Sequence, residues 1–304
     1  ALGGERISMQ LAYYMEYGGC ELNEQEITVS FDSEIADRIR MRKVELVPAA
    51  MAAYREQLDD NYLFTEPCLC PDLLTPVRGG ILRPYASQWR AAWIDLLVTP
   101  EMCGGSYPVT VSVSRGTELL WSETVTISAV HSVLPEQRLI YTEWLHADCL
   151  ADYYNVEPFS ERYWEILEQF VHTAAEHGVN MLLTPVFTPP LDTLVAKESI
   201  WPLLADCHVI DALSSFTIYQ AGVVEHPIVC NDFLEPFLEA GVENLWTYYC
   251  CVQGHEVSNQ FMAMPSARNR ILGVQLYLYR MKGFLHWGYN FYNSQHSVSA
   301  VNPY

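Results

Sequence analysis

The segment Arg138-Leu-Ile-Tyr-Thr-Glu-Trp144 opens the part of the chain that decides the fold. Its short run of apolar, β-branched and aromatic residues predicts a strand. A helix is then predicted from an N-cap at Ser160 to a terminating Gly178, because its apolar positions fall on one face. A second strand is predicted over Asn180-Met-Leu-Leu-Thr-Pro-Val-Phe187. Strand, helix and strand in this order predict a βαβ unit with a right-handed crossover, and therefore a parallel sheet.

The same alternation of strands and helices continues toward the C-terminus. Strands are predicted over 209–213, 244–251 and 283–287, and helices over 194–204, 232–240 and 265–281. Repeated units of this kind predict that residues 135–304 form a (β/α)8 TIM-type barrel. That barrel is incomplete in this chain, since about 170 residues contain only five predicted strands, whereas such barrels need about 200 to 250 residues. The shortage falls near residues 193–211, where we expect a missing segment.

The N-terminal part of the chain has a different pattern. Between residues 7 and 130, short alternating or apolar runs are separated by turn residues, with no strong helical periodicity. This spacing predicts an antiparallel β-sandwich. Because the pattern changes at Pro135, we place a β-sandwich domain at residues 1–134 and the barrel domain at residues 135–304. The expected fold class is therefore multi-domain, β followed by α/β.

Composition excludes several classes of function. Of the 304 residues, 17 are Lys or Arg and 37 are Asp or Glu, which gives a net charge of −20 and disfavours binding to a nucleic acid. No apolar run reaches the roughly 20 residues that span a bilayer, so no membrane partner is expected. The nine cysteines are scattered without a C-x-x-C pair, which favours reduced thiols and a cytoplasmic location. The first residues, Ala1–Arg6, have no signal-peptide pattern.

Aromatic and amide side chains collect where the predicted strands end. Residues 283–293 contain five aromatic rings, one His and two Asn, and flat rings beside amides suit a polyhydroxylated sugar better than a phosphate or a metal. Because the reactive groups of a parallel barrel gather at the carboxyl ends of its strands, residues there are candidates for a carbohydrate site. The predicted substrate-binding residues are Trp144, His146, Asp148, Asp192, Tyr248, Trp287, Tyr289 and Asn290.

Structural roles are open for several polar residues at these strand ends. Glu143 also fits a hydrogen-bonded layer inside the barrel, and Asp192 also fits a helix N-cap. His146 and Asp148 are spaced i, i+2, but no second His or acidic pair supports a metal site. Motifs for a serine nucleophile, a phosphate loop or a dinucleotide are absent from the sequence. We therefore expect neither a metal nor another cofactor.

Five ordered segments carry a resemblance to a known family. They are Trp144–Asp148, Thr184–Thr193, Asn244–Cys250, Arg268–Gly273 and Gly283–Asn293. Together they resemble the bacterial family called domain of unknown function 4091, which is similar to glycoside hydrolase family 123, the β-N-acetylgalactosaminidases. The resemblance implies a sandwich ahead of a barrel and retaining hydrolysis assisted by the substrate, a recognised exception to the two-carboxylate mechanism. It also implies an adjacent Asp-Glu pair at the end of a middle strand: the Asp orients a 2-acetamido group and the Glu protonates the leaving oxygen.

The sequence departs from that family at the catalytic pair. No Asp-Glu dipeptide occurs in the 304 residues, so the catalytic residues are unknown. Three explanations are open: the middle segment is omitted from this sequence, it is deleted from the protein, or other carboxylates replace the pair, with Glu143 and Asp192 as the fallback candidates. We favour omission, because Thr193 joins Leu194 without the turn residues of an evolved loop.

These observations predict a glycoside hydrolase that acts on an N-acetylhexosaminide or a related glycan. The alternative is a non-catalytic carbohydrate-binding protein that has lost the acid pair. A third hypothesis, a metal-dependent hydrolase around His146 and Asp148, requires a bound metal. A carbohydrate is the expected partner in the first two cases, and the sequence leaves the oligomeric state open.

Overall fold

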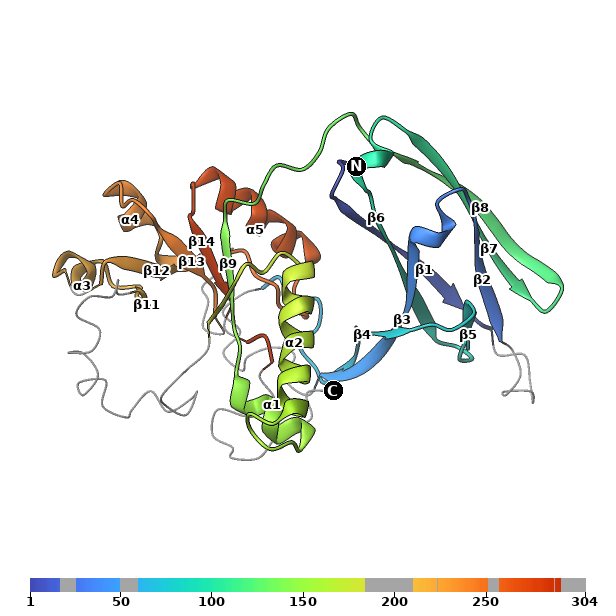
Figure 1. Ribbon diagram of the computed structural model, residues 1–304, viewed down its shortest axis with the longest axis horizontal. Coiled ribbons are helices and arrows are strands. Elements are labelled where there is room, and N and C mark those ends of the chain that lie inside the picture. The colour runs from blue at the N-terminus through green and yellow to red at the C-terminus, as the bar shows by residue number, and fades with distance from the viewer. Residues whose placement is uncertain are drawn as a thin grey trace. The chain divides into compact units, whose positions relative to one another are not determined.

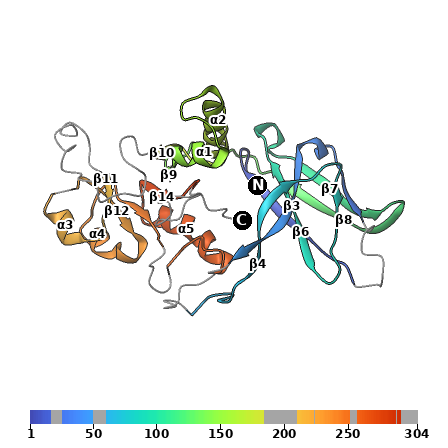
Figure 2. The same cartoon turned by 90° about the horizontal axis from the view of Figure 1, so that it is seen from below.

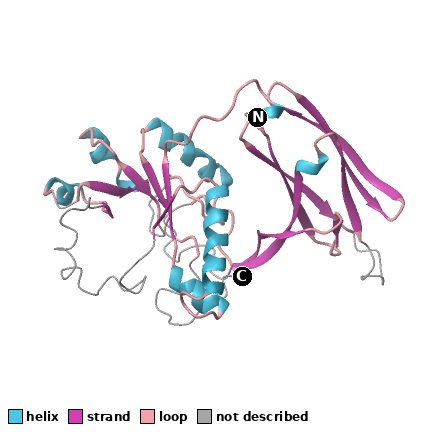
Figure 3. Cartoon of the chain, in the orientation of Figure 1, coloured by secondary structure: helices cyan, strands magenta, loops and turns pink. Residues whose placement is uncertain are grey.

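The structure is a computed structural model of residues 1–304. It describes residues 1–16, 26–49, 60–183, 210–222, 224–250, 257–286 and 288–290. The chain divides into two compact units (Figure 1): the first consists of Ala1–Ala50 and Pro67–Glu136, and the second of Met51–Glu66 and Gln137–Tyr304. Strands make up most of the first unit, whereas the long helices belong to the second (Figure 3).

The described residues of the first unit form two four-stranded antiparallel sheets. One has the strand order β1-β6-β3-β4 and the other β5-β2-β7-β8. The bounds are β1 Arg6–Tyr14, β2 Ile27–Asp32, β3 Ile39–Ala49, β4 Cys68–Pro76, β5 Ile81–Leu82, β6 Trp89–Leu97, β7 Ser106–Arg115 and β8 Glu118–Ser128, with short 3-10 helices η1 at Ala36–Arg38 and η2 at Pro100–Met102. The predicted antiparallel strands of this region are therefore confirmed.

One apolar core is shared by the two sheets. Ala92 and Leu96 of β6 contribute to it from one sheet, and Val29 of β2 and Val111 of β7 contribute from the other. Alternate residues of each strand point inward, which is the period expected for a sheet with one buried face. β8 is different, since ten of its eleven residues are exposed, and it lies at the edge of its sheet in the described part of the chain.

A buried carboxylate links three strands of the first sheet. The side chain of Asp95 in β6 is fully buried and accepts hydrogen bonds from Arg6 in β1, at 2.6 Å, and from Arg42 in β3, at 2.5 Å. Burial by itself would raise the pKa of Asp95, but the hydrogen bonds and charges of the two arginines outweigh it, so the pKa is lowered. Asp95 therefore ties three neighbouring strands together as an anion.

The described strands of the second unit form one parallel sheet. Its strand order is β10-β9-β14-β13-β12-β11, and every neighbouring pair is parallel. The bounds are β9 Ile140–Trp144, α1 Ala147–Tyr154, α2 Glu161–Glu176, β10 Met181–Leu183, β11 Ile210–Ala212, α3 Phe216–Gln220, β12 His226–Cys230, η5 Asn231–Phe233, α4 Glu235–Glu239, β13 Trp246–Tyr248, α5 Ser266–Leu278 and β14 Gly283–His286. The first and last strands, β9 and β14, are direct neighbours (Figures 1 and 2).

The parallel sheet of β/α units is confirmed, whereas its closure into an eight-stranded barrel stays a prediction. Among the described residues the sheet has six strands with β10 and β11 at its edges. Residues 184–209, which connect those two edges and include most of the expected missing segment, lie outside the described residues.

The ends of α2 agree with the sequence prediction, whereas the helix predicted over 232–240 differs from the structure. Ser160 caps α2 by accepting a hydrogen bond from the backbone N–H of Tyr163 at 3.2 Å, and Gly178 follows the helix with a φ of +85°, both as predicted. The predicted helix over 232–240 is shorter, with α4 only five residues long and a 3-10 turn, η5, before it. Pro236 has no N–H to donate to a preceding turn, which explains why the α-helix starts only at Glu235.

The two faces of the parallel sheet have different surroundings. On one face, Val229 of β12 and Phe284 of β14 pack with Phe237 of α4 and with Leu272 of α5. We call this the helix-covered face. The opposite face carries Ile228, Trp246 and Leu285, with Ile140, Trp144 and Tyr248 partly buried around them, and no residue of a described helix belongs to this cluster. We call it the aromatic face.

A glycine allows close packing on the aromatic face. Gly283 begins β14, and its Cα is paired with that of Trp246 in β13. A Cβ atom at position 283 would overlap the indole ring of Trp246. Glycine at this position therefore lets the Trp246 ring lie flat across the neighbouring strand.

Candidate functional site

The carboxyl ends of β9 and β14 bring together candidate residues that are far apart in the sequence. The strands are paired in parallel, so the residues that follow them meet at the same edge of the sheet. The pairing continues beyond the strands, because the backbone N–H of Tyr289 donates a hydrogen bond to the carbonyl oxygen of Trp144 at 3.1 Å. Trp144, His146, Tyr289 and Asn290 therefore occupy one neighbourhood.

Asn290 joins the two chain segments through its side-chain amide. Its Oδ1 accepts a hydrogen bond from the backbone N–H of His146 at 2.7 Å, and its Nδ2 donates to the carbonyl oxygen of His146 at 2.9 Å. Asn290 is only 2% exposed. The prediction that Asn290 binds sugar hydroxyls stays a prediction, and the contacts of its amide are with the protein backbone.

Trp144 and Tyr248 lie on the aromatic face, each as the last residue of its strand. The indole Nε1 of Trp144 is buried and has no hydrogen-bond acceptor among the residues that the structure describes. The hydroxyl of Thr142, two residues earlier on the same face, is likewise buried without a described partner. Flat rings together with buried donors that lack acceptors are the features expected where a polar, ring-shaped ligand binds.

Glu143 lies on the other side of the sheet, on the helix-covered face. Its Oε1 accepts a hydrogen bond from the Tyr141 hydroxyl at 2.6 Å, and its Oε2 lies 2.9 Å from Nδ1 of His286. Glu143 is 6% exposed, so both oxygens are used inside the protein. The fallback assignment of Glu143 as a catalytic residue stays a prediction, and its surroundings are those of a buried polar pair.

The Glu143 carboxylate acts on the pKa values of three tyrosines. Burial, together with the hydrogen bond to Glu143 and its negative charge, raises the pKa of Tyr141. Burial also raises the pKa of Tyr249 and of Tyr289, with a smaller contribution from the Glu143 charge. The three hydroxyls are therefore donors at neutral pH. The Tyr289 hydroxyl donates to the carbonyl oxygen of Phe170 in α2 at 2.8 Å, which fixes its ring against that helix.

His146 and Asp148 lie at the amino end of α1. His146 is 1% exposed and occupies the N-cap position of α1, with its ring edge-on to Trp144 at a centroid distance of 6.3 Å. Asp148 belongs to the first turn of α1, although its side chain is not among those described. Asp192 and Trp287 lie outside the described residues.

No metal centre is visible in the described ranges: no three or more His, Cys, Asp or Glu side chains there gather as a metal ion would require. In the same ranges, no helix is long and apolar enough to cross a membrane.

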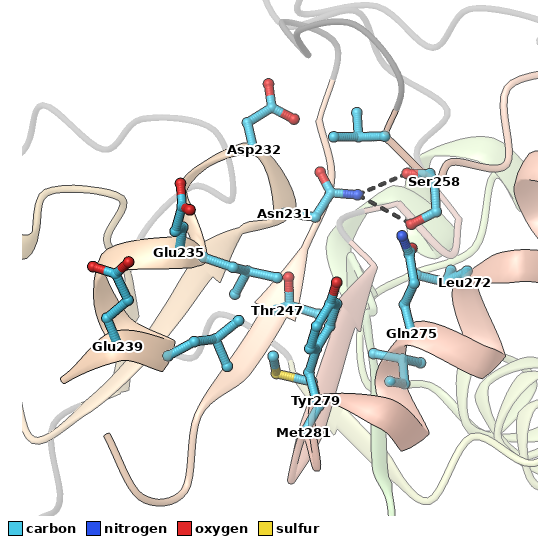
Figure 4. A pocket seen from close by; sticks show the side chains of 14 residues that line it. Asn231, Asp232, Glu235, Glu239, Thr247, Ser258, Leu272, Gln275, Tyr279 and Met281 are labelled. Carbon is cyan, nitrogen blue, oxygen red and sulfur yellow. Dashed lines mark hydrogen bonds between the residues drawn. The ribbon is translucent and has the colours of Figure 1, made fainter. Parts of the chain in front are cut away.

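A cavity of about 470 Å³ lies on the helix-covered face between η5, α4 and α5. Glu235 and Glu239 stand on one wall, with Gln275 and Tyr279 on the other (Figure 4). Leu272, Leu276 and Met281 form apolar parts of its lining. The sequence did not indicate this cavity, because Glu235 and Glu239 resemble an ordinary solvated helix face. It is on the opposite side of the sheet from Trp144 and Tyr248, so it is a separate feature.

Comparisons with known proteins are consistent with this architecture. Residues 144–201 and 192–304 match the family model described as glycoside hydrolase 123, catalytic domain. A solved structure of a family 123 glycoside hydrolase from Clostridium perfringens, studied for glycolipid glycan hydrolysis, aligns with a TM-score of 0.65 at 12% identity, over 94% of this chain and 73% of that chain. At this identity the alignment shows a shared fold.

Two further comparisons gave weak similarity or none. A domain-of-unknown-function 4466 family protein from Parabacteroides merdae aligns with a TM-score of only 0.24 at 10% identity, over 42% of this chain and 38% of that chain. No curated protein matches the chain.

Proposed function

The chain belongs to the family of glycoside hydrolase 123 catalytic domains, and from this premise we propose that it hydrolyses an N-acetylhexosaminide or a related glycan with assistance from the substrate. The observation that carries the proposal is the family match from residue 144 to residue 304, the part of the chain that holds the parallel sheet and its aromatic face. The family supports hydrolysis of a glycoside, and the sugar and the mechanism are what we propose.

In the proposed mechanism, the carbonyl oxygen of the substrate's 2-acetamido group attacks the anomeric carbon. The new carbon–oxygen bond forms as the glycosidic bond breaks, and a carboxylic acid of the enzyme gives its proton to the leaving oxygen. Water then attacks the same carbon, gives a proton to the carboxylate that the first step left and opens the cyclic intermediate, so the configuration at that carbon is retained. The family resemblance implies that an Asp orients the acetamido group and that an adjacent Glu donates the proton.

The acid pair is proposed to lie on strands that this sequence does not contain. No Asp-Glu dipeptide occurs in the 304 residues. The family match falls in two segments that overlap at residues 192–201, which is where the predicted barrel is short of strands. This coincidence supports a missing segment near residues 193–211. In the complete protein we propose a β-sandwich domain at residues 1–134, followed by a (β/α)8 barrel domain that begins at residue 135.

The sugar subsite is proposed on the aromatic face, at the carboxyl edge of the sheet. Trp144 and Tyr248 supply ring faces there, and the Trp144 indole N–H supplies a donor that has no described acceptor. Asp148, Asp192 and Trp287 remain proposed contributors from the sequence. Stacking of a sugar on such rings contributes about 0.5–1.5 kcal/mol beyond area burial, by analogy with aromatic pairs.

The test compares binding with turnover. The 304-residue chain is expected to bind N-acetylgalactosamine, measured by calorimetry, and to hydrolyse aryl N-acetyl-β-hexosaminides no faster than buffer, because proton donation typically supplies about 10²–10⁴-fold in rate. A gene product that contains an Asp-Glu pair in the middle segment is expected to hydrolyse at least one such glycoside and to lose this activity when the Glu becomes Gln. Turnover by the 304-residue chain itself would return Glu143 and Asp192 to consideration as the working pair.

A non-catalytic carbohydrate-binding protein is the second candidate, because the sequence as it stands lacks the acid pair. Sequencing the gene between the codons for Thr193 and Asp211 separates the two candidates. An Asp-Glu codon pair there supports the hydrolase, and an uninterrupted reading frame without one supports the binding protein.

A cytoplasmic location is also part of the proposal. It is supported by the nine cysteines of the sequence, which are scattered without a C-x-x-C pair, a pattern that favours reduced thiols. Mass spectrometry of the protein from its native source, with thiols blocked before lysis, tests this, and disulfide-linked peptides would contradict it.

A further inference from the structure

Two asparagines hold strand β9 at its two ends in the same manner. At the amino end, Asn180 accepts a hydrogen bond from the backbone N–H of Tyr141 at 2.9 Å and donates one to the carbonyl oxygen of Leu139 at 3.0 Å. At the carboxyl end, Asn290 also accepts one hydrogen bond and donates another, here to the N–H and the carbonyl oxygen of the same residue, His146. Each side-chain amide thus takes the place of a strand neighbour where regular pairing stops.

The two clamps differ in burial and in position. Asn290 is 2% exposed, whereas Asn180 is exposed. Asn290 also stands at the carboxyl edge of the sheet, where ligand sites of parallel sheets form, and Asn180 stands at the opposite edge. In the same segment as Asn290, the N–H of Tyr289 bonds to the carbonyl oxygen of Trp144. Three hydrogen bonds therefore fix residues 144–146 against residues 289 and 290.

We propose that Asn290 is a positioning residue of the sugar site, one that acts through the backbone of His146 to hold the Trp144 ring where an N-acetylhexosamine stacks. The inference rests on the proposed function, and it deepens that function by assigning Asn290 to the protein backbone instead of a sugar hydroxyl. His146 is two residues from Trp144 and its ring lies edge-on to the indole. A change in the His146 backbone is therefore transmitted directly to the wall of the site.

The experiment uses the 304-residue chain and N-acetylgalactosamine as the probe, with binding measured by calorimetry. Two variants are compared with the wild type: Asn290→Ala removes both bonds, and Asn290→Asp is nearly isosteric, keeps the acceptor for the His146 N–H and loses the donor. Asn180→Ala is the matched control, because it removes the same two kinds of bond from the same strand at the other edge. Circular dichroism and thermal unfolding establish that each variant is folded at the temperature of the binding measurement.

The expected result is that both Asn290 variants bind the probe on the order of tenfold more weakly, since a displaced ring loses most of its contact, while Asn180→Ala binds as the wild type does. The same weakening is expected for the 3-, 4- and 6-deoxy analogues and for galactose, which lacks the acetamido group. A positioning residue imposes an equal penalty on every ligand. A residue that contacts one ligand group imposes no penalty on the ligand that lacks it.

Four other results would contradict either the role of Asn290 or the proposed function. If the penalty of Asn290→Ala disappears for one deoxy analogue, Asn290 touches that hydroxyl and the inference is wrong. If Asn290→Ala and Asn180→Ala weaken binding equally, the effect is general destabilisation and the inference is again wrong. If folded Asn290 variants bind like the wild type, only the inference is lost and the proposed function stands. If the wild type itself does not bind, the proposed function is lost and the inference with it.

Discussion

Glu143 and His286 form a partly buried hydrogen-bonded pair across β9 and β14, with Oε2 and Nδ1 separated by 2.9 Å. Their Cα atoms are paired in the strand register, so the two side chains leave the sheet on the same side. Trp144, the next residue after Glu143, leaves it on the other side, where it belongs to the aromatic face. Consecutive residues of β9 therefore face opposite sides of the sheet. Glu143 lies on the helix-covered face, and Trp144 lies on the aromatic face with the proposed sugar site.

Replacing Glu143 by Gln is expected to spare sugar binding. The amide keeps the shape of the carboxylate and can accept from His286 while it donates to the Tyr141 hydroxyl, so the free energy of unfolding falls by only about 1 kcal/mol. His286→Ala is expected to cost about 3 kcal/mol, because it leaves a buried carboxylate without one of its partners. The exposed pair Glu168 and His172 in α2 is the control, and His172→Ala is expected to change stability by less than about 0.5 kcal/mol. Urea unfolding and calorimetric binding check these values, and lost affinity in a folded Glu143→Gln protein would contradict the prediction.

Asp95 is expected to make the first unit sensitive to acid. Its pKa is lowered in the folded protein, so its contribution to stability is fully present above the unfolded value of about 3.9 and is lost as pH falls through the lower, folded value. Asp95→Asn is expected to lower the free energy of unfolding by about 2 kcal/mol at pH 7 and to flatten its fall below about pH 4. Denaturant unfolding at pH 7, 5, 4 and 3 measures both effects. Parallel curves for the two proteins across this range would show that Asp95 is not the group responsible.

Gly283→Ala is expected to disturb the aromatic face. The added Cβ overlaps the Trp246 ring, which must rotate away or push β13 from β14, at a cost of about 1–3 kcal/mol. Gly273→Ala in α5 is the matched control, since nothing lies within 4 Å of a Cβ there and alanine favours a helix. The expected readouts are a lower melting temperature and a changed tryptophan fluorescence for the first variant only. A Gly283→Ala protein with wild-type fluorescence would contradict the packing described for Trp246.

Trp144→Phe is expected to separate binding from stability. The phenyl ring keeps an aromatic face but removes the buried indole N–H that has no described acceptor, so stability should be unchanged or slightly higher. Affinity for N-acetylgalactosamine should fall about three- to tenfold, the value of one hydrogen bond. Trp164→Phe, at a half-exposed position in α2, should change neither quantity. Equal affinities for wild type and Trp144→Phe would remove the indole N–H from the proposed sugar site.

The two kinds of sheet could be predicted from the sequence, because strand and helix periodicity depend only on residues that are close together along the chain. Period-2 runs with short turns gave the antiparallel strands, and the capped amphipathic helix α2 gave the βαβ unit. β12 was missed because Pro227 interrupts a short apolar run, and proline usually argues against a strand. α1 was missed because His146 makes no side-chain capping bond that a sequence could signal.

The arrangement of the site depends on contacts that no local pattern reports. Alternation along β9 shows that Glu143 and Trp144 face opposite sides, but which side the helices cover follows only from the packed structure. The pairing of β9 with β14 joins residues more than 130 positions apart, and a single sequence does not encode that choice of neighbour in its periodicity. The hydrogen bonds of Asn290 to the His146 backbone depend on this pairing, so the sequence alone does not show them.

Strand β8 has a consequence for handling the protein in concentrated solution. Leu119, Leu120 and Trp121 are exposed along a sheet edge whose backbone can template another strand. Glu123 is one charge that opposes such addition, and the net charge of −20 repels approaching copies over a longer range. Salt screens that repulsion to within about 10 Å at 0.1 M, so the protein is expected to form edge-to-edge oligomers as ionic strength rises, and Leu119→Lys should suppress them in light scattering.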